Sequence, residues 1–286
     1  MEIMLIVMAV LLGLTLVLSI VLSFLLTRRK DKGERHDPKE FGLEYETVKI
    51  KTADGLTLTG WFMPVKGSDR AVLILHGHGT GMDLDLHHAQ VLHQNGFTVL
   101  MIDFRGHARS EGKLITFGYL ERRDALAAVA YLKACGMRKV ALMGFSMGGM
   151  TSILTAPICP EVDAVVDDGA PPRLTSALKG YIVEIGLPKF LAPFLAWLTV
   201  VGTSLRLGVN LFAYEPVRWV GKIAPRPLFI IHGDLDQYGP DIDDLLKAAP
   251  FAQVWRVPDV GHVQACNGYP EQWNKKVLDF LNCNLA

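Results

Sequence analysis

Short apolar runs alternate with longer amphipathic stretches along most of the chain. The runs are bounded by turn residues and often carry β-branched side chains, as strands do, whereas the stretches repeat apolar residues at helical spacing. The predicted strands are Glu44–Ile50, Leu56–Phe62, Ala71–Leu75, Thr98–Ile102, Val140–Met143, Val162–Val166, Leu228–Ile231 and Gln253–Val257. The predicted helices are Leu84–Asn95, Tyr119–Cys135, Met147–Ala156, Asp243–Lys247 and Glu271–Leu281. This alternation predicts an α/β fold with a mostly parallel central sheet flanked by helices.

One segment interrupts the alternation. Residues 171–214 lie between the sixth and seventh predicted strands and have a mostly helical, strongly apolar pattern. Within them, Phe190–Leu205 carries no charge, but Pro193 and Gly202 interrupt the run, and it is shorter than the about 20 residues that cross a bilayer. We interpret the segment as a small helical cap. It either packs on the core or forms an apolar lid over a pocket, in contact with a bilayer.

The amino-terminal residues are the most apolar part of the chain. Ile3–Leu26 contains no charged residue and is long enough for a helix that crosses a hydrocarbon core about 30 Å thick. A cleaved signal peptide typically has a basic start and a small-residue cleavage site, but this chain starts Met1-Glu2 and the run ends in bulky residues. We therefore expect residues 1–27 to be an uncleaved, single-pass transmembrane anchor.

Basic residues follow the apolar run at once. Between Thr27 and Glu40 there are six basic and four acidic residues. The positive-inside bias places this side of the membrane in the cytoplasm, together with the rest of the chain. We expect residues 28–40 to form a basic juxtamembrane linker, either solvated or in contact with anionic headgroups, and residues 41–286 to form the main domain.

The charge balance excludes one broad class of function. Lys and Arg number 29, as do Asp and Glu, so the formal net charge is zero and nothing indicates a nucleic-acid partner. The four cysteines are scattered and predict free thiols rather than a disulfide scaffold. His87, His88 and His93 share a predicted helix, but His88 and His93 are five residues apart rather than four, so we expect no metal site there.

A nucleophile motif stands between a predicted strand and a predicted helix. Gly144-Phe145-Ser146-Met147-Gly148 fits G-x-S-x-G in the context that this motif requires. The tight turn exposes the hydroxyl of Ser146 above the sheet, and the next backbone N–H lies at a helix amino terminus. The motif alone is only suggestive, because two glycines around a serine also occur by chance.

A serine nucleophile needs a base, and the base needs a residue that orients it. His262 lies in the loop between the last predicted strand and the last predicted helix, and Asp234 and Asp236 follow the seventh predicted strand. All of them stand at carboxyl ends of strands, where such sheets carry their sites. The order serine, aspartate, histidine is typical of one hydrolase architecture, although the residues alone do not separate the two aspartates.

With these motifs the chain resembles the α/β-hydrolases, and in particular their membrane-anchored serine aminopeptidase-like or lysophospholipase-like members. The resemblance covers about Phe41 to Leu285, and the transmembrane anchor lies outside it. The motifs that carry it, in chain order, are His76-Gly77-His78-Gly79, Asp103-Phe104-Arg105-Gly106-His107, the nucleophile motif, the H-G-x-x-D stretch from His232 to Asp236 and Gly261-His262.

The resemblance implies a role for each matching residue. Ser146 would be the nucleophile, His262 the general base and acid, and Asp236, rather than Asp234, the residue that orients His262. The backbone N–H groups of His78 and Met147 would form the oxyanion hole, and neither a cofactor nor a metal would be needed.

We therefore expect a serine hydrolase that cleaves carboxylic esters through an acyl-enzyme. The apolar cap and the lack of an Arg/Lys cluster favour a neutral, hydrophobic acyl compound or a lipid-like ester as the substrate. The same residues can also cleave amides or peptides or transfer acyl groups, and a catalytically silent, membrane-tethered scaffold is the alternative from another class. The oligomeric state stays open.

Overall fold

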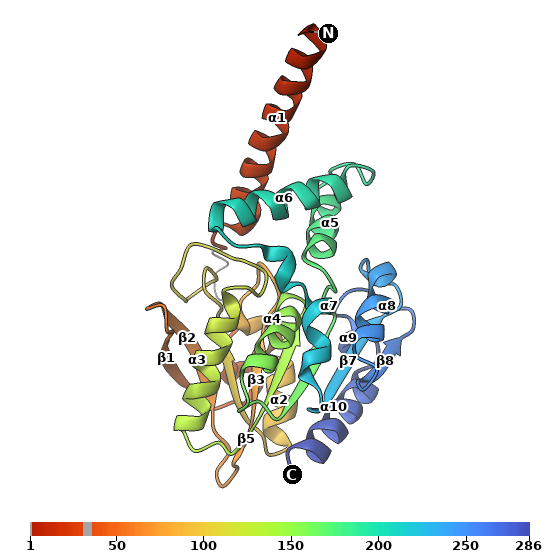
Figure 1. The fold of residues 1–286 in the computed structure, drawn as a ribbon. Helices are drawn as coiled ribbons and strands as arrows, with labels where there is room; N and C mark the ends of the chain where they lie inside the picture. The colour runs from red at the N-terminus through yellow and green to blue at the C-terminus, as the bar shows by residue number, and fades with distance from the viewer. Residues whose placement is uncertain (1, 31–35) are drawn as a thin grey trace.

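One mixed sheet organises the protein. In the computed structural model, which describes residues 2–30 and 36–286, eight strands lie in the order β1-β2-β4-β3-β5-β6-β7-β8 (Figure 1). β2 pairs antiparallel with β1 and with β4, and every other neighbouring pair is parallel. The strands are β1 (Glu46–Lys51), β2 (Thr57–Met63), β3 (Arg70–Leu75), β4 (Thr98–Ile102), β5 (Lys139–Phe145), β6 (Ala164–Asp168), β7 (Leu228–Gly233) and β8 (Gln253–Val257). The predicted fold class is confirmed, and β4 and β8 have the predicted bounds.

Helices cover both faces of the sheet. Successive side chains of a strand point to opposite faces, so Leu73 of β3 packs into one apolar cluster and Ile74 into another. The first cluster includes residues of α3, α4 and α8, and the second includes residues of α2 and α10. Burial on both faces is why the central strands are continuous apolar runs. The helices outside the cap are α2 (Leu86–Gln94), α3 (Glu121–Ala134), α4 (Met147–Thr155), α7 (Pro216–Trp219), α8 (Gly239–Ala248), α9 (Ala265–Gly268) and α10 (Pro270–Asn284).

The segment predicted as a cap contains two helices, α5 (Leu174–Glu184) and α6 (Ala192–Leu207), which pack against each other above the carboxyl ends of the strands (Figure 1). Gly208 ends α6 in the left-handed conformation that glycine adopts without strain. The chain then returns to the sheet through short helical turns. The 3-10 turns of the chain are η1 (Pro38–Phe41), η2 (Met82–Asp85), η3 (Ala156–Ile158), η4 (Leu211–Tyr214) and η5 (Val220–Ile223).

α1 (Glu2–Thr27) is long and apolar enough to cross a membrane, as an anchor or a signal sequence is. Most of it projects away from the domain, but its last turns pack against α6 (Figure 1). There Ser19 donates a hydrogen bond to the carbonyl of Leu198, and Thr203 donates to the hydroxyl of Ser23 at 3.0 Å. The two helices approach closely at Gly202, because a Cβ there would lie 2.7 Å from the carbonyl oxygen of Ser19. We call this contact the α1–α6 seam.

The residues directly after α1 are bound to the domain. The backbone N–H of Lys30 donates to the carbonyl of Gly106 at 2.8 Å, and its carbonyl accepts from the N–H of Ala108 at 3.1 Å. The guanidinium of Arg29 donates to three backbone carbonyls of residues 108–112. At these two positions backbone groups of the domain bind the chain, a contact that neither of the alternatives for the linker, solvated or bound to headgroups, includes. Residues 31–35 of the predicted linker lie outside the described residues.

Candidate active site

Ser146 occupies the sharp turn between β5 and α4. Its φ of 53° lies in the left-handed region that residues other than glycine rarely adopt. The turn needs glycine on both sides, because a Cβ on Gly144 would overlap the backbone of Gly148, and a Cβ on Gly148 would overlap the carbonyl of Leu75. The local sequence therefore holds a strained serine at the carboxyl end of a buried strand, in the arrangement that the motif predicts.

Ser146, His262 and Asp236 form one hydrogen-bonded chain. The Nε2 atom of His262 lies 2.8 Å from Oγ of Ser146, and its Nδ1 atom lies 2.8 Å from Oδ2 of Asp236. The second oxygen of Asp236 accepts a hydrogen bond from the N–H of Tyr238 at 2.9 Å. Asp236 is buried whereas Asp234 is exposed, so the geometry distinguishes the two aspartates that the residues alone left open.

The buried carboxylate sets the orientation of the imidazole. A carboxylate accepts hydrogen bonds, so the proton of a neutral His262 belongs on Nδ1, and Nε2 is left to accept the hydroxyl proton of Ser146. The edge of Tyr238 packs against the ring of His262, with the centroids 4.8 Å apart. Together these contacts fix both the tautomer and the direction of the ring.

The two expected oxyanion donors lie beside Ser146. Met147 is the first residue of α4, so its N–H has no partner within the helix and lies at the positive end of the helix dipole. His78 belongs to the loop after β3, and its ring stacks on Phe117 with the centroids 4.5 Å apart. Both residues line the same cavity as Ser146.

Neighbouring histidines and charges hold these loops in place. His76 accepts a hydrogen bond from the N–H of Phe104 at 3.0 Å, and burial lowers its pKa to about 4. His107 accepts from the N–H of Gly79 at 3.2 Å, and burial lowers its pKa to about 3. Both rings are therefore neutral at pH 7. Arg105 donates to Asp54 and Asp124 and ties the turn after β4 to the rest of the domain.

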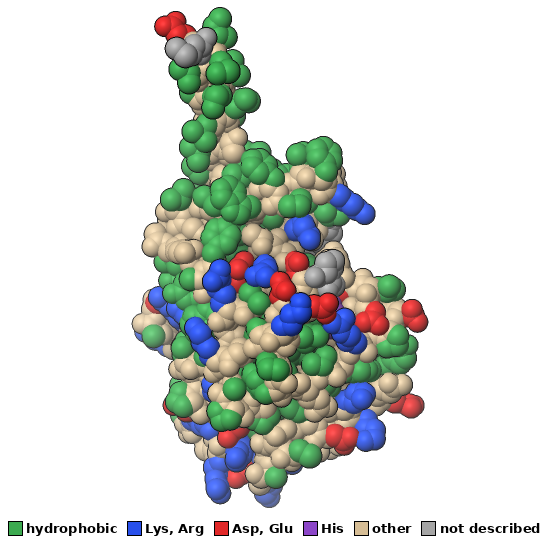
Figure 2. Space-filling model, turned by 45° about the vertical axis from the view of Figure 1, so that its right-hand side comes forward, with side chains coloured by type: hydrophobic (Ala, Val, Ile, Leu, Met, Phe, Trp, Pro, Cys, Tyr) green, Lys and Arg blue, Asp and Glu red, His purple; other side chains and the backbone are tan. Residues whose placement is uncertain are grey.

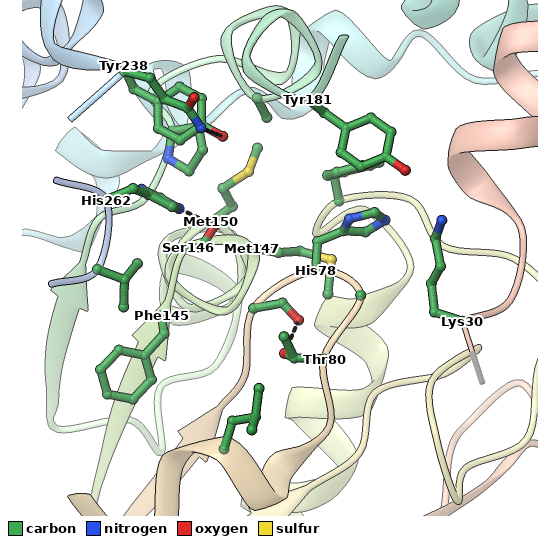
Figure 3. Close-up of a pocket in the computed structure, with 18 of the residues that line it drawn as sticks. Lys30, His78, Thr80, Phe145, Ser146, Met147, Met150, Tyr181, Tyr238 and His262 are labelled. Atoms are coloured by element: carbon green, nitrogen blue, oxygen red, sulfur yellow. Dashed lines mark hydrogen bonds between the residues drawn. The ribbon is translucent and has the colours of Figure 1, made fainter. Parts of the chain in front are cut away.

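A cavity of about 450 Å³ opens beside Ser146 (Figure 3), within the range of cavities that bind small molecules. Its wall includes residues of the β3–η2 loop, α4, the cap helix α5 and the loops that carry Tyr238 and His262. Much of the wall is apolar or aromatic. The lining residues outside the proposed triad and oxyanion hole include Phe117, Phe145, Met150, Ala177, Tyr181 and Tyr238.

One lysine and one aspartate of the wall have no role in the proposed catalytic triad or oxyanion hole. Lys30, from the segment after α1, lines the cavity. Its position could not be predicted, because no local sequence signal indicates what a linker residue contacts. Asp85 lines it as well, and burial, reinforced by Asp168 and Asp83, raises its pKa to about 8. At pH 7 most of the Asp85 side chains are therefore neutral.

One cluster of metal-binding residue types lies outside this arrangement. Ligand atoms of His87, His88 and Cys266 lie within 4.8 Å of one another among the described residues. The helical spacing considered in the sequence does not reveal it, because Cys266 comes from α9 and the two histidines from α2. Among the described residues this cluster offers three ligand atoms to a metal ion. The expectation that the enzyme needs no metal stays a prediction.

The chain matches one known protein family over most of its length. The model of the alpha/beta hydrolase family matches residues 72–276, well over half of the chain. The chain belongs to the alpha/beta hydrolase family. The match includes the nucleophile turn and the positions of Asp236 and His262, and it confirms the resemblance drawn from the motifs. The protein is accordingly an enzyme of the hydrolase class.

Individual known proteins resemble the chain over different shares of its length. The structure of the Pyrococcus furiosus esterase Pf2001 has a TM-score of 0.75 and 27% identity, and the likeness covers 91% of this chain and 99% of that chain. The uncharacterized protein YfhR of Escherichia coli O157:H7 is 25% identical over 255 residues, or 83% of this chain and 82% of YfhR. Protein bem46 of Schizosaccharomyces pombe is 30% identical over 137 residues, which is 45% of each chain.

Proposed function

We propose that this alpha/beta hydrolase is a membrane-anchored serine esterase that cleaves carboxylic esters of hydrophobic acyl groups through an acyl-enzyme. The observation that carries the proposal is the hydrogen-bonded chain from Ser146 through His262 to Asp236 at the edge of a cavity. The structurally similar protein from Pyrococcus furiosus is an esterase, which supports esters as the substrate class.

The first half of the reaction forms the acyl-enzyme. Nε2 of His262 takes the hydroxyl proton as Oγ of Ser146 bonds to the ester carbonyl carbon. The carbonyl oxygen becomes an oxyanion, which accepts hydrogen bonds from the N–H groups of His78 and Met147. One such donor is worth about 2.7–4 kcal/mol of the barrier. His262 then protonates the leaving alkoxide as the carbon–oxygen bond breaks.

The second half releases the acid. Water gives a proton to Nε2 of His262 while its oxygen bonds to the acyl carbon, and the same donors hold the second oxyanion. The bond to Oγ then breaks, and the proton returns from His262 to Ser146. Asp236 stays ionised throughout and stabilises the imidazolium that forms twice in each cycle.

The anchor proposal rests on the α1–α6 seam. Five residues of α1 are buried, all of them between Ser19 and Thr27, and Leu22 and Leu26 join the main apolar cluster of the domain. Removing the helix as a signal peptide would expose the face of α6 around Gly202 and Thr203 to water. A retained anchor keeps that face covered, so we infer a single-pass membrane protein whose domain is cytoplasmic, in line with the basic residues after α1.

The cap adds a second contact with the membrane. Apolar side chains gather on α1 and on the cap beside it, whereas charged side chains lie mostly below them (Figure 2). The exposed large apolar residues of the cap are Ile185, Leu187, Phe190, Leu191, Phe194, Trp197 and Leu205. Because α1 fixes the cap next to the bilayer, we propose that this surface lies in the headgroup region and that the cavity below it receives lipid-like esters.

Labelling and kinetics test the proposed chemistry. We expect a fluorophosphonate probe to label the full chain in detergent, and the Ser146→Ala variant to remain unlabelled. We also expect hydrolysis of nitrophenyl esters, faster for long acyl chains than for short ones. A labelled protein that cleaves aminoacyl amides but no ester would support the peptidase alternative. Labelling that persists in Ser146→Ala, or no labelling at all, would contradict the proposed mechanism.

A further inference from the structure

Among the residues that the structure describes, Lys30 brings a positive charge to a cavity wall that is otherwise nearly neutral. It lines the cavity together with Ser146, and its ammonium lies 5.7 Å from the centre of the Tyr181 ring. Among the described residues, no carboxylate lies within 4 Å of this ammonium. Asp85 is the acidic residue in the described part of the wall, and most of it is protonated at pH 7 because burial raises its pKa to about 8.

The backbone fixes this lysine in place. Both backbone hydrogen-bonding groups of Lys30 are used by the loop after β4, and the preceding Arg29 is bound to three carbonyls of the same loop. Lys30 therefore differs from most lysines in solvated linkers, whose backbone is free to move. Its backbone position is set, and its half-buried side chain extends along the cavity wall.

The position of Lys30 relative to Ser146 and α1 suggests what it binds. In Figure 3, His78 and Tyr181 lie between Ser146 and Lys30, and the chain from α1 runs on the Lys30 side. Thr27 ends α1, so Lys30 follows three residues after the membrane-facing helix. An ester whose carbonyl lies at Ser146 can thus extend past His78 toward the side from which amphiphiles would enter.

We propose that Lys30 binds an anionic group, phosphate or carboxylate, on the substrate, so that the enzyme prefers anionic acyl amphiphiles over neutral ones. This inference rests on the proposed esterase function and refines it, because the sequence favoured a neutral substrate on the grounds that no basic cluster was visible. A single ammonium in a largely uncharged cavity is enough to favour an anion, since charged hydrogen bonds are stronger there than in water.

A matched pair of substrates tests the preference. Lauroylglycerol phosphate and lauroylglycerol share the ester and the acyl chain and differ in one anionic group. We expect the full chain, in nonionic detergent micelles, to have a higher kcat/KM for the phosphate. In Lys30→Gln the ratio of the two kcat/KM values should fall roughly tenfold or more, mainly through KM for the anionic ester. An unchanged ratio would overturn the proposal.

Two further variants separate recognition from general effects. Arg28→Gln removes the same charge from the same segment, but its side chain is exposed and does not line the cavity, so the ratio should stay that of the natural chain. Lys30→Arg should retain most of the preference. Added salt should lower the ratio in the natural chain and change it little in Lys30→Gln. A fall in the ratio for Arg28→Gln as large as for Lys30→Gln would overturn the proposal.

A binding measurement tests the Lys30 proposal independently of esterase activity. If no ester is hydrolysed, the esterase proposal fails, and calorimetric titration of Ser146→Ala with dodecyl phosphate still measures the anion site. We expect binding about tenfold weaker when Lys30→Gln is added. Equal binding would overturn the Lys30 proposal. Inorganic phosphate should not compete with dodecyl phosphate, and competition at equal concentrations would overturn the assignment to an amphiphile rather than a free anion.

Discussion

Nε2 of His262 lies 2.8 Å from Oγ of Ser146, although the two residues are 116 positions apart in the chain. Ser146 follows β5 and His262 follows β8, and two other strands, β6 and β7, lie between these in the sheet. All four strands are parallel, so their carboxyl ends share one edge, and the loops from the two outer strands can meet above the inner ones. The contact is therefore a consequence of the sheet order.

The two aspartates after β7 offer a matched test of the site. Asp236 is buried against His262, whereas Asp234 is exposed two residues earlier. We expect Asp236→Asn to lower kcat for ester hydrolysis by about 10⁴-fold, because an amide favours the wrong tautomer of the imidazole. Asp234→Asn should keep nearly full activity. Equal losses in the two variants, measured with a nitrophenyl ester and purified full chain, would refute the proposed role of Asp236.

The nucleophile turn depends on close backbone contacts at Gly148. A Cβ there would overlap the carbonyl of Leu75, and backbone cannot move aside as a flexible side chain can. We expect Gly148→Ala to displace Ser146 and lower kcat/KM by about a hundredfold or more. Gly261→Ala is the control, because Gly261 adjoins His262 but has open space around its Cβ position. Normal kinetics in Gly148→Ala would show that the turn tolerates a side chain.

Much of the fold was predictable because its signals are local. A strand buried on both faces is an apolar run wherever it occurs, and the five residues of G-x-S-x-G are enough to identify the nucleophile turn. The position of Asp236 was different. The choice of Asp236 over Asp234 came from the family resemblance. Two loop carboxylates so close in sequence differ only in burial, and burial depends on the whole domain.

The contacts of Lys30 and of the cap could not be predicted in the same way. The charges around Lys30 indicate a linker, but its contacts arise from backbone groups of a loop some 76 residues away, at Gly106. Likewise, hydropathy identifies both Leu195 and Phe194 as apolar. Leu195 is buried, whereas Phe194 is exposed on the proposed membrane surface of the cap. Composition does not reveal which apolar residue faces the core and which faces lipid.

The α1–α6 seam predicts a stability effect at one glycine. A Cβ on Gly202 would lie 2.5 Å from the hydroxyl of Ser19 and 2.7 Å from its carbonyl, so the helices would have to separate. We expect Gly202→Ala to lower the free energy of unfolding by about 1–3 kcal/mol, as overpacking does. Gly13→Ala makes the same change on α1, where the space is open. Thermal unfolding of the full chain in detergent should show a lower Tm for Gly202→Ala alone.

The buried carboxyl of Asp168 predicts a dependence of stability on pH. Burial raises its pKa from 3.8 to about 6, against the opposing hydrogen bond that Trp273 donates at 2.9 Å. The folded protein therefore holds this proton more tightly than the unfolded chain. As the pH rises from about 4 to about 6, ionisation costs stability, and above pH 6 the full cost of about 3 kcal/mol remains.

Asp168→Asn should remove that cost, since a neutral amide oxygen can still accept the hydrogen bond from Trp273. We expect the variant to be more stable than the natural chain by roughly 3 kcal/mol at pH 8 and by little at pH 4, as measured by denaturant unfolding. Asp259→Asn, which removes an exposed carboxyl, is the control. A stabilisation by Asp168→Asn that is as large at pH 4 as at pH 8 would mean that relief of packing, and not ionisation of a buried acid, is responsible.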